Sequence, residues 1–258
     1  MSRALAVVLA PALALSAAAP ALADLPELKA RGVLRVVVAA EEAPETFDPR
    51  TESGFERELI GTFAHANGLR LEVVVAKTHP ERIDLLLAGR GDLIAAIFDT
   101  PERRQRVAFT SEVMPTYNLS ATLAPRPAVA SLEDLRRLRV GVVKGTATAE
   151  DPAVAAIASL HRYESKEAML AALRSGTVDA LVMPVSELAL ASEKLPGLQP
   201  GVQVGSLGSS AWAVRKEDAA LRTALDQHLE YVRKSAAWNR LLVKYFGERA
   251  PMVLGRRR

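Results

Sequence analysis

The amino-acid sequence predicts an α/β fold arranged as two lobes. Short apolar segments alternate with amphipathic helical segments along the chain, which is typical of α/β proteins. One pattern, a helix that ends near Gly and is followed by Asp and a strand, occurs at residues 85–96 and again at residues 171–182. The chain has 258 residues and no Cys. It is therefore long enough to bury one large core or two smaller ones without disulfides.

The first 23 residues have the pattern of a secretory signal peptide. Arg3 precedes an apolar run that ends in a small-x-small site at residues 21–23, which suits signal peptidase. A membrane anchor is the alternative, but two Pro residues and the shortness of the apolar core disfavour a spanning helix. We expect cleavage before Asp24, which makes the mature chain a periplasmic protein. No Cys stands at the cleavage site, so a lipoprotein is not expected.

The first half of the chain is predicted to be β-α-β-α-β. The helix after the first strand has apolar residues at helical spacing and ends at Asn67-Gly68, and the next helix ends at Gly89. The runs between them are short, apolar and rich in Val, Leu and Ile, as buried strands are. The predicted elements are a strand at 33–40, a helix at 55–68, a strand at 69–76, a helix at 80–91 and a strand at 92–98.

The second half repeats this order. A strand runs into a loop of small residues at 137–148, and a helix, a Gly and a strand follow at 165–184. Such joints are common in α/β proteins, but three matched elements in one order favour two related lobes. The matched positions are Leu87 with Leu173, Gly89 with Gly176, and Asp92 with Asp179.

Two extended segments are expected to connect the lobes. The first begins at residue 116 and leads through a Pro-rich loop to a helix with Ser131 as its N-cap. The second is the Gly- and Ser-rich segment 201–218, after which residues 219–247 have helical periodicity. Two crossings with small residues suit a hinge. The predicted division is a first lobe at 24–120 and 205–258, and a second lobe at 121–204.

Charge and composition exclude several classes of function. The formal net charge is +3, and it becomes +2 when residues 1–23, which contain one Arg, are removed. A nearly balanced charge with 5% aromatic residues does not match a nucleic-acid-binding surface. The four His are far apart and no phosphate-binding loop motif is present, so we expect neither a metal nor another cofactor. We expect a monomer that binds a small molecule.

Several segments in order resemble the family 3 extracellular solute-binding proteins of bacterial ABC importers. They span nearly all of the chain after residue 23 and include "ARGVLRVVV", "LLAGRGDLIAAIFDTPERRQRVAFT", "LEDLRRLRVGVVKGTAT" and "WNRLLVKYFG". The resemblance implies a two-lobed type II periplasmic binding protein fold, with a mixed sheet flanked by helices in each lobe and a ligand cleft between them. It also implies delivery of the solute to an ABC permease at the inner membrane.

The resemblance also implies which residues contact a ligand. In amino-acid binders of this family the Arg of "TPER" holds the ligand carboxylate, and here that residue is Arg103. A guanidinium suits this role because it is always charged and forms a two-pronged hydrogen bond with a carboxylate. Pairing with an acid of its own lobe is the alternative. The loop Thr146, Ala147 and Thr148 would offer N–H and hydroxyl groups from the second lobe, unless Thr148 merely caps a helix.

The sequence departs from the pattern of the amino-acid binders at two positions. Phe98 and Asp99 replace a small polar segment before the Arg, and Pro184 stands where an Asp usually pairs with the ligand ammonium. Ser186 and Glu187 follow closely. Glu41 or Asp99 would then take the cation, or the ligand is not an α-amino acid. The remaining candidates are Phe47 or Phe55 as an aromatic wall, and Glu42 and Glu45, which are expected to be surface charges.

Three functions remain open at this stage. The first is a solute-binding protein, not an enzyme, that closes on a small polar, carboxylate-bearing, amino-acid-like solute. The second is an accessory or sensor protein with the same fold, since the resemblance extends to lytic transglycosylase N-terminal modules and to accessory proteins of quinoprotein dehydrogenases. The third is a dehydratase-type enzyme, with Glu41 or Asp99 as general acid. Fold alone does not decide between them.

Overall fold

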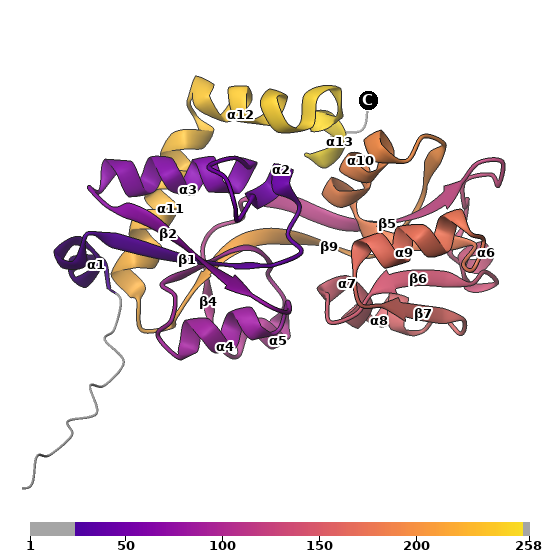
Figure 1. The fold of residues 1–258 in the computed structure, drawn as a ribbon, viewed down its shortest axis with the longest axis horizontal. Coiled ribbons are helices and arrows are strands. Elements are labelled where there is room, and N and C mark those ends of the chain that lie inside the picture. The colour runs from indigo at the N-terminus through magenta and orange to yellow at the C-terminus, as the bar shows by residue number, and fades with distance from the viewer. Residues whose placement is uncertain (1–23, 255–258) are drawn as a thin grey trace, which may run out of the picture.

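Two groups of helices and strands lie side by side in the computed structural model, which describes residues 24–254 (Figure 1). The long strands β5 (Met114–Leu123) and β9 (Leu198–Val214) connect them. This is the two-lobed α/β fold predicted from the sequence. The predicted signal peptide lies outside the described residues. Among residues 24–254, no helix is both long enough and apolar enough to cross a membrane.

The first lobe is built on three parallel strands. β1 (Val33–Ala39) lies between β2 (Arg70–Ala76) and β3 (Leu93–Phe98) and pairs in parallel with both. β1 is apolar at every position except Arg35, as expected of a parallel strand that helices cover on both faces. The helices of this part of the chain are α1 (Leu25–Arg31), α2 (Pro44–Phe47), α3 (Phe55–Ala66), α4 (Glu81–Leu87) and α5 (Pro101–Arg104).

The second lobe repeats this arrangement on a smaller scale. β6 (Val140–Val143) lies between the parallel strands β7 (Leu160–Tyr163) and β8 (Ala180–Pro184). Its first helix begins as predicted, because the Ser131 hydroxyl accepts a hydrogen bond from the Asp134 N–H at 3.1 Å. The helices are α6 (Leu132–Arg136), α7 (Ala147–Glu150), α8 (Pro152–Ala155), α9 (Lys166–Arg174) and α10 (Val185–Lys194).

The two crossing strands pair with each other, so one sheet runs through both lobes. β5 and β9 are antiparallel, and the strand order is β2-β1-β3-β9-β5-β8-β6-β7, with β4 (Ala108–Phe109) beside β9. The lobe boundaries expected at residues 120 and 204 fall inside these two strands. The division of the chain into lobes at those residues stays a proposal.

The C-terminal segment forms two main helices rather than one. α11 (Ala219–Arg233) ends before Ser235, whose hydroxyl caps α12 (Ala236–Phe246). The short helices η1 (Gly247–Arg249) and α13 (Ala250–Val253) then return toward α10 of the second lobe. Val253 is buried in the same apolar cluster as Ala189 of α10. The C-terminus therefore contributes a further apolar contact between the two lobes.

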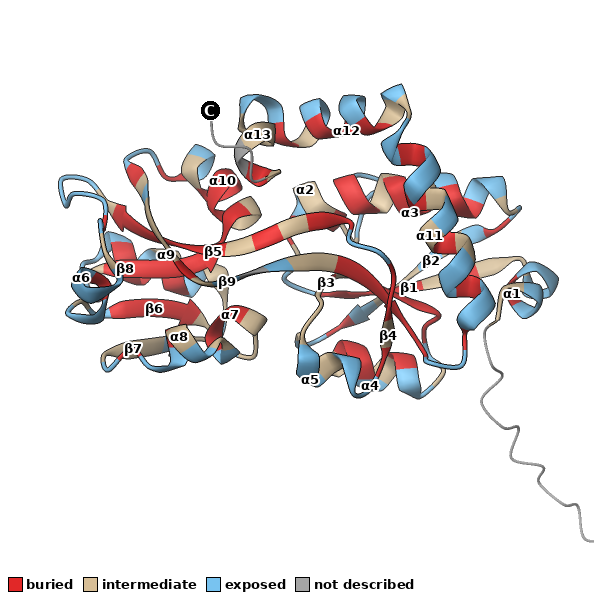
Figure 2. Cartoon of the chain, turned by 180° about the vertical axis from the view of Figure 1, so that it is seen from behind, coloured by how far each residue is buried: buried red, intermediate tan, exposed pale blue. Residues whose placement is uncertain are grey.

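Buried residues follow the strands and the sheet-facing sides of the helices (Figure 2). The largest cluster contains Trp212 of β9, which is fully buried, together with the Phe55 and Phe63 side chains of α3. The Phe55 ring meets the Trp238 ring edge-on, with 5.3 Å between centroids. This cluster holds α3 and α12 in place, and α3 carries residues of the cleft described below.

Asp92 and Asp179 form the same joint in each lobe. The Asp92 carboxylate accepts a hydrogen bond from the Arg35 N–H at 2.8 Å, and the Asp92 N–H donates one to the Arg35 carbonyl. Asp179 makes the same exchange with Arg139. Each Asp thus locks the start of one strand to its neighbour, which explains the repeated helix-Gly-Asp-strand pattern. Asp92 also pairs with Arg31 and Arg35 and lies 3.8 Å from Arg215, which is itself buried.

We predict that Asp92→Ala lowers the free energy of unfolding by roughly 3–5 kcal/mol, because it removes a fully buried carboxylate that pairs with Arg31 and Arg35. The buried Arg215 would keep Asp218, at 2.9 Å, as its acidic partner. Asp179→Ala is the matched comparison, and we expect roughly 1 kcal/mol, because Arg139 is half exposed. Urea unfolding of both variants measures the difference. Equal losses at the two positions would contradict the claim that the joint of the first lobe is the stronger.

Candidate functional site

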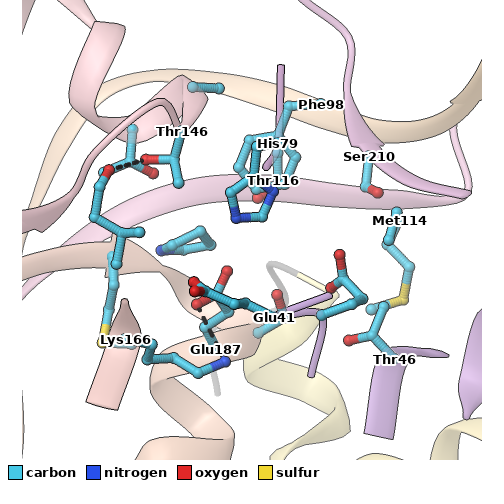
Figure 3. A pocket seen from close by; sticks show the side chains of 18 of the residues that line it. Glu41, Thr46, His79, Phe98, Met114, Thr116, Thr146, Lys166, Glu187 and Ser210 are labelled. Carbon is cyan, nitrogen blue, oxygen red and sulfur yellow. Dashed lines mark hydrogen bonds and ion pairs between the residues drawn. The ribbon is translucent and has the colours of Figure 1, made fainter. Parts of the chain in front are cut away.

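A cleft lies between the lobes, beside the crossing strands. It contains about 1060 Å³ of space not filled by atoms, part of it open to solvent. The first lobe contributes Glu41, Phe98 and Arg103, and the second contributes the loop around Thr146. Figure 3 shows the side chains that line it. The structure therefore brings most of the predicted ligand residues, from distant parts of the sequence, to one cavity.

The lobes touch on both sides of this cleft. On one side Gly145 lies so close to Pro80 that an added Cβ would be 3.5 Å from the Pro ring, and Gly145 has a φ of +69°. On the other side Lys194 of α10 pairs with Glu45 of α2 at 3.3 Å. Glu45 was expected to be only a surface charge, and it instead forms an ion pair between the lobes. The two lobes therefore approach each other at both rims of the cleft.

Arg103 projects into the cleft from α5. The Thr100 hydroxyl caps this helix by accepting from the Arg103 N–H, and the guanidinium donates to the Phe98 carbonyl at 3.0 Å. Burial lowers the pKa of Arg103, while Glu150 of the second lobe opposes this effect. The guanidinium forms no ion pair among the described residues. The alternative that it pairs with an acid of its own lobe is therefore wrong.

Asp99 is not brought to the cleft. Its carboxylate binds the exposed neighbour Arg104 through two hydrogen bonds. Arg103 and Arg104 are adjacent on one helix, and they point to different places: Arg103 into the cleft and Arg104 to Asp99. Phe98 does line the cleft and is half-buried. Phe55 touches the cleft as well, but its ring is almost wholly buried in the core.

The loop after β6 faces Arg103 from the second lobe. Thr146, rather than Thr148, caps α7, since its hydroxyl accepts from the Ala149 N–H. Thr148 is buried and donates to the Asn118 side chain at 2.8 Å. The alternative that Thr148 caps a helix is thus wrong, because α7 begins two residues earlier than that role requires. The N–H groups of a first helical turn have no acceptor within the helix, and here that turn borders the cleft.

A buried ionic cluster, which sequence reasoning missed, forms one wall. The Arg82 side chain of α4 is 3% exposed and lies 3.9 Å from the Glu42 carboxylate. It also donates to the Ala96 carbonyl at 2.8 Å, while the Ala96 N–H donates to Glu56 at 2.8 Å. Glu56 further accepts from the Trp212 indole at 2.9 Å. Glu42 was expected to be a surface charge, and burial against Arg82 shows otherwise.

This cluster fixes a strained residue next to the cleft. Ala96 has a φ of +50°, where a non-Gly residue costs roughly 1–3 kcal/mol. The register of β3 against β9 shifts between Ile94 and Ile97, so Ala96 is part of a bulge. Arg82 and Glu56 hold its carbonyl and N–H. The bulge changes the direction of β3 just before Phe98 and Arg103, and so it helps to orient both.

Burial changes the protonation of several groups here. It raises the pKa of Glu42 to about 7 and that of Glu56 to about 7, and it lowers the pKa of His79 to about 3. Arg82 and Arg103 add to the effect on His79. His79 is therefore neutral near pH 7, while the two Glu titrate close to it. Burial also raises the pKa of Glu41, although this side chain is exposed at the mouth of the cleft.

A Lys–Glu pair occupies the second-lobe wall. Pro184 precedes α10, and Glu187 in the first turn of that helix lies 3.6 Å from the Lys166 ammonium at the start of α9. Figure 3 shows this pair across the cavity from His79 and Phe98. Sequence reasoning noted Glu187 but missed Lys166. A basic residue directly after a helix N-cap is disfavoured by the helix dipole, and that placement was the available clue.

No group of three or more His, Cys, Asp or Glu within residues 24–254 is arranged to hold a metal ion. One further polar group does lack a partner. Thr116 of β5 lines the cleft, is 8% exposed, and its hydroxyl has no hydrogen bond among the described residues. A buried hydroxyl without a partner is unfavourable unless a ligand or water satisfies it. Thr116 is therefore a candidate contact that the sequence did not reveal.

The geometry is that of a cleft for a small polar ligand, and the family comparison agrees with it. Residues 34–248 match the family described as bacterial extracellular solute-binding proteins, family 3. The chain belongs to this family. The resemblance drawn from the sequence is thereby confirmed. The family is extracellular by its description, and its members are named for binding solutes.

Relatives of this solute-binding protein include parts of larger enzymes. It is 28% identical over 239 residues to the membrane-bound lytic murein transglycosylase F of Pseudomonas syringae pv. syringae (strain B728a). The aligned region covers 86% of this chain and 47% of that protein. The enzyme of the same name from Stutzerimonas stutzeri (strain A1501) is 29% identical, with 87% and 48% covered. The chain thus spans about half the length of these relatives.

Solved structures confirm the type II periplasmic binding protein fold. Holo ArgBP from T. maritima is 26% identical, with a TM-score of 0.72, and the match covers 86% of this chain and 99% of that chain. An ancestral arginine-binding protein bound to arginine is 25% identical, with a TM-score of 0.74 and coverage of 84% and 99%. Both align over nearly their whole length, so the match includes both lobes.

The raised pKa of Glu42 predicts a pH dependence of stability. The folded protein holds the carboxyl proton of Glu42 more tightly than the unfolded chain does. The contribution of this protonated carboxyl group to the free energy of unfolding is therefore complete below pH 4.5 and is lost as the pH rises through about 7. We expect wild type to lose more stability than Glu42→Gln between pH 5 and 8.5 in urea unfolding. His79 acts in the opposite direction, with stability lost as the pH falls below 6.5, but it cancels in the comparison.

Glu45→Gln is the matched control, since it makes the same change of charge at the rim of the same cleft. We expect this variant to follow the wild-type pH profile more closely than Glu42→Gln does. If Glu42→Gln and wild type lose stability in parallel across this range, Glu42 is ionised in the folded state at all these pH values and the assignment is wrong.

Proposed function

We propose that this protein captures a small polar, carboxylate-bearing solute by closure of its lobes in the periplasm, and delivers it as a monomer to an ABC importer. It acts as a binding protein, not an enzyme. The observation that carries this proposal is Arg103, a cleft-lining guanidinium that has a backbone carbonyl as partner and no carboxylate among the described residues. A bidentate carboxylate is the ligand that best completes its hydrogen bonds.

Closure would follow from contacts made by both lobes at once. Arg103 belongs to the first lobe, whereas Thr146, Ala147 and Thr148 belong to the second. A carboxylate held between the guanidinium and the N–H groups of that loop contacts both only when the cleft is closed. A ligand shifts the equilibrium toward closure by its tighter binding to the closed state. The solute therefore stabilises the form that a permease would recognise.

Other predicted residues would contact the rest of the solute. Phe98 provides an apolar wall beside Arg103, and the edge of Phe55 lies deeper. Glu41 at the mouth can accept hydrogen bonds from the solute. Asp99 is left out of this proposal because Arg104 occupies its carboxylate. The arginine-binding proteins with the same fold support a solute in the size range of an amino acid.

A non-transport role is the second candidate, and one observation favours it. The transglycosylases that resemble this chain are about twice its length, so a domain of this kind also occurs next to a murein-cleaving enzyme in one polypeptide. A sensor would bind its ligand in the same cleft and pass the closed form to an enzyme or receptor. Cross-linking in intact cells with and without ligand distinguishes the two roles: an ABC permease as ligand-dependent partner supports transport, and a cell-wall enzyme supports sensing.

We predict that Arg103→Ala weakens binding of the cognate carboxylate by roughly 10- to 150-fold, which corresponds to losing a charged hydrogen-bonding partner. Arg104→Ala is the control, because this neighbour on α5 pairs with Asp99 outside the cleft. Thermal unfolding of ligand-free protein, titrated with amino acids and small carboxylates, gives the affinities. Unchanged binding by Arg103→Ala would refute the carboxylate clamp.

A further inference from the structure

Lys166 places a positive charge inside the cleft from the second lobe. Its side chain is 21% exposed, and its ammonium lies 3.6 Å from Glu187. The Glu187 carboxylate holds the pKa of Lys166 above its usual value, and Glu42 across the cleft adds to this effect. Lys166 therefore stays charged under all ordinary conditions. Its position at the start of α9 is unfavourable for a cation, so helix stability does not explain the residue.

Three of the four acids that line the cleft already have partners. Glu187 faces Lys166, and Glu42 faces the buried Arg82. Glu56 accepts from the indole of Trp212, the Ala96 N–H and the Ser210 hydroxyl, so it is satisfied by the protein. A ligand ammonium that enters this site would have to compete with a tethered cation for each of the first two carboxylates.

Glu41 is the fourth acid that lines the cleft, and it is more exposed to solvent than the other three. It is exposed at the mouth, where water solvates the carboxylate and where an ion pair adds little to binding. Deeper in the cleft, the polar groups that lack a suitable partner in the protein are not carboxylates. Among the described residues they include the guanidinium of Arg103, which has a carbonyl partner but no anion, and the hydroxyl of Thr116. They suit a carboxylate and a neutral hydrogen-bonding group.

From this arrangement we propose that Lys166 is a built-in substitute for a ligand ammonium, and that the cleft selects carboxylates whose α-substituent is neutral over free α-amino acids. The α-substituent would be a hydroxyl, an oxo group or an acylated amine. This proposal rests on the proposed solute-binding function and specifies its ligand class. Lys166 acts as the specificity-determining residue, since its charge neutralises Glu187 and repels a second cation.

The test compares pairs of ligands that differ at the α-substituent alone. The probes are L-alanine with L-lactate and N-acetyl-L-alanine, L-glutamate with 2-hydroxyglutarate, and L-arginine with its 2-hydroxy analogue. Calorimetry is done on the purified protein after unfolding and refolding, which removes carried-over ligand. In the pair of probes that binds best, we expect the ligand with the neutral α-substituent to bind at least about tenfold more tightly than the amino acid with the same side chain. This difference equals about one charged hydrogen bond.

Variants of Lys166 test the cause of the preference. Lys166→Met should lower the ratio of the affinity for the neutral ligand to the affinity for the amino acid by about tenfold, or reverse the preference. The reason is that Glu187 becomes free to accept a hydrogen bond from a ligand ammonium. Lys166→Arg should keep the wild-type preference, because it keeps the charge. Lys144→Met removes one positive charge from an exposed pair with Glu164 in the same lobe and should leave the ratio unchanged.

Each result bears on one of the two proposals. If wild type prefers the amino acid in every pair, or if Lys166→Met leaves the ratio unchanged, the role assigned to Lys166 is wrong while solute binding stands. If Arg103→Ala abolishes binding when either of these two results is obtained, the role of Arg103 as the carboxylate-binding residue stands. If no probe binds wild type or Lys166→Met, the solute-binding function fails for this ligand class, and the proposal about Lys166 fails with it.

Discussion

The pairing of β5 with β9 is the constraint on which the rest of the molecule depends. These antiparallel strands join the two lobes, and their hydrogen bonds make one sheet of what would otherwise be two. The cleft lies beside them, so residues on each lobe meet at a place set by this strand pair. Thr116 and Ser210 extend from the two strands into the cleft itself. A change in the twist of this pair would move Arg103 relative to Thr146 without altering the core of either lobe.

The cleft is an ionic environment in which most charges are matched within the protein. Glu42 with Arg82, and Lys166 with Glu187, are pairs in a partly buried site where an unpaired charge would be costly. Arg103 and the exposed Glu41 are the exceptions among the described residues. The guanidinium of Arg103 reaches a carbonyl and no acid of the described chain, so it presents an unmatched positive charge to the space where a ligand would lie. Matching the neighbouring charges internally makes this one the main electrostatic feature of the cleft.

Two contacts and one bulge control how this site is presented. The bulge at Ala96 is held by Arg82 and Glu56, and it directs the end of β3 toward the cleft. Pro80 against Gly145, and Glu45 against Lys194, join the lobes at opposite rims. Val253 near the C-terminus and Ala189 of α10 lie in one buried apolar cluster, which adds a further contact between the lobes.

The sequence by itself determined most of the main helices and strands, their order and the repeated Asp positions, because hydrophobic periodicity and caps such as Ser131 act over a few residues. It did not reveal β7 or α10. The family motif also directed attention to Arg103 and the Thr146 loop, which the structure places in the cleft. It could not show that Arg104 occupies Asp99, that Glu42 is buried beside Arg82, or that Lys166 faces Glu187. These partners are distant in sequence or differ in side-chain direction, so packing of the two lobes decided which charges meet.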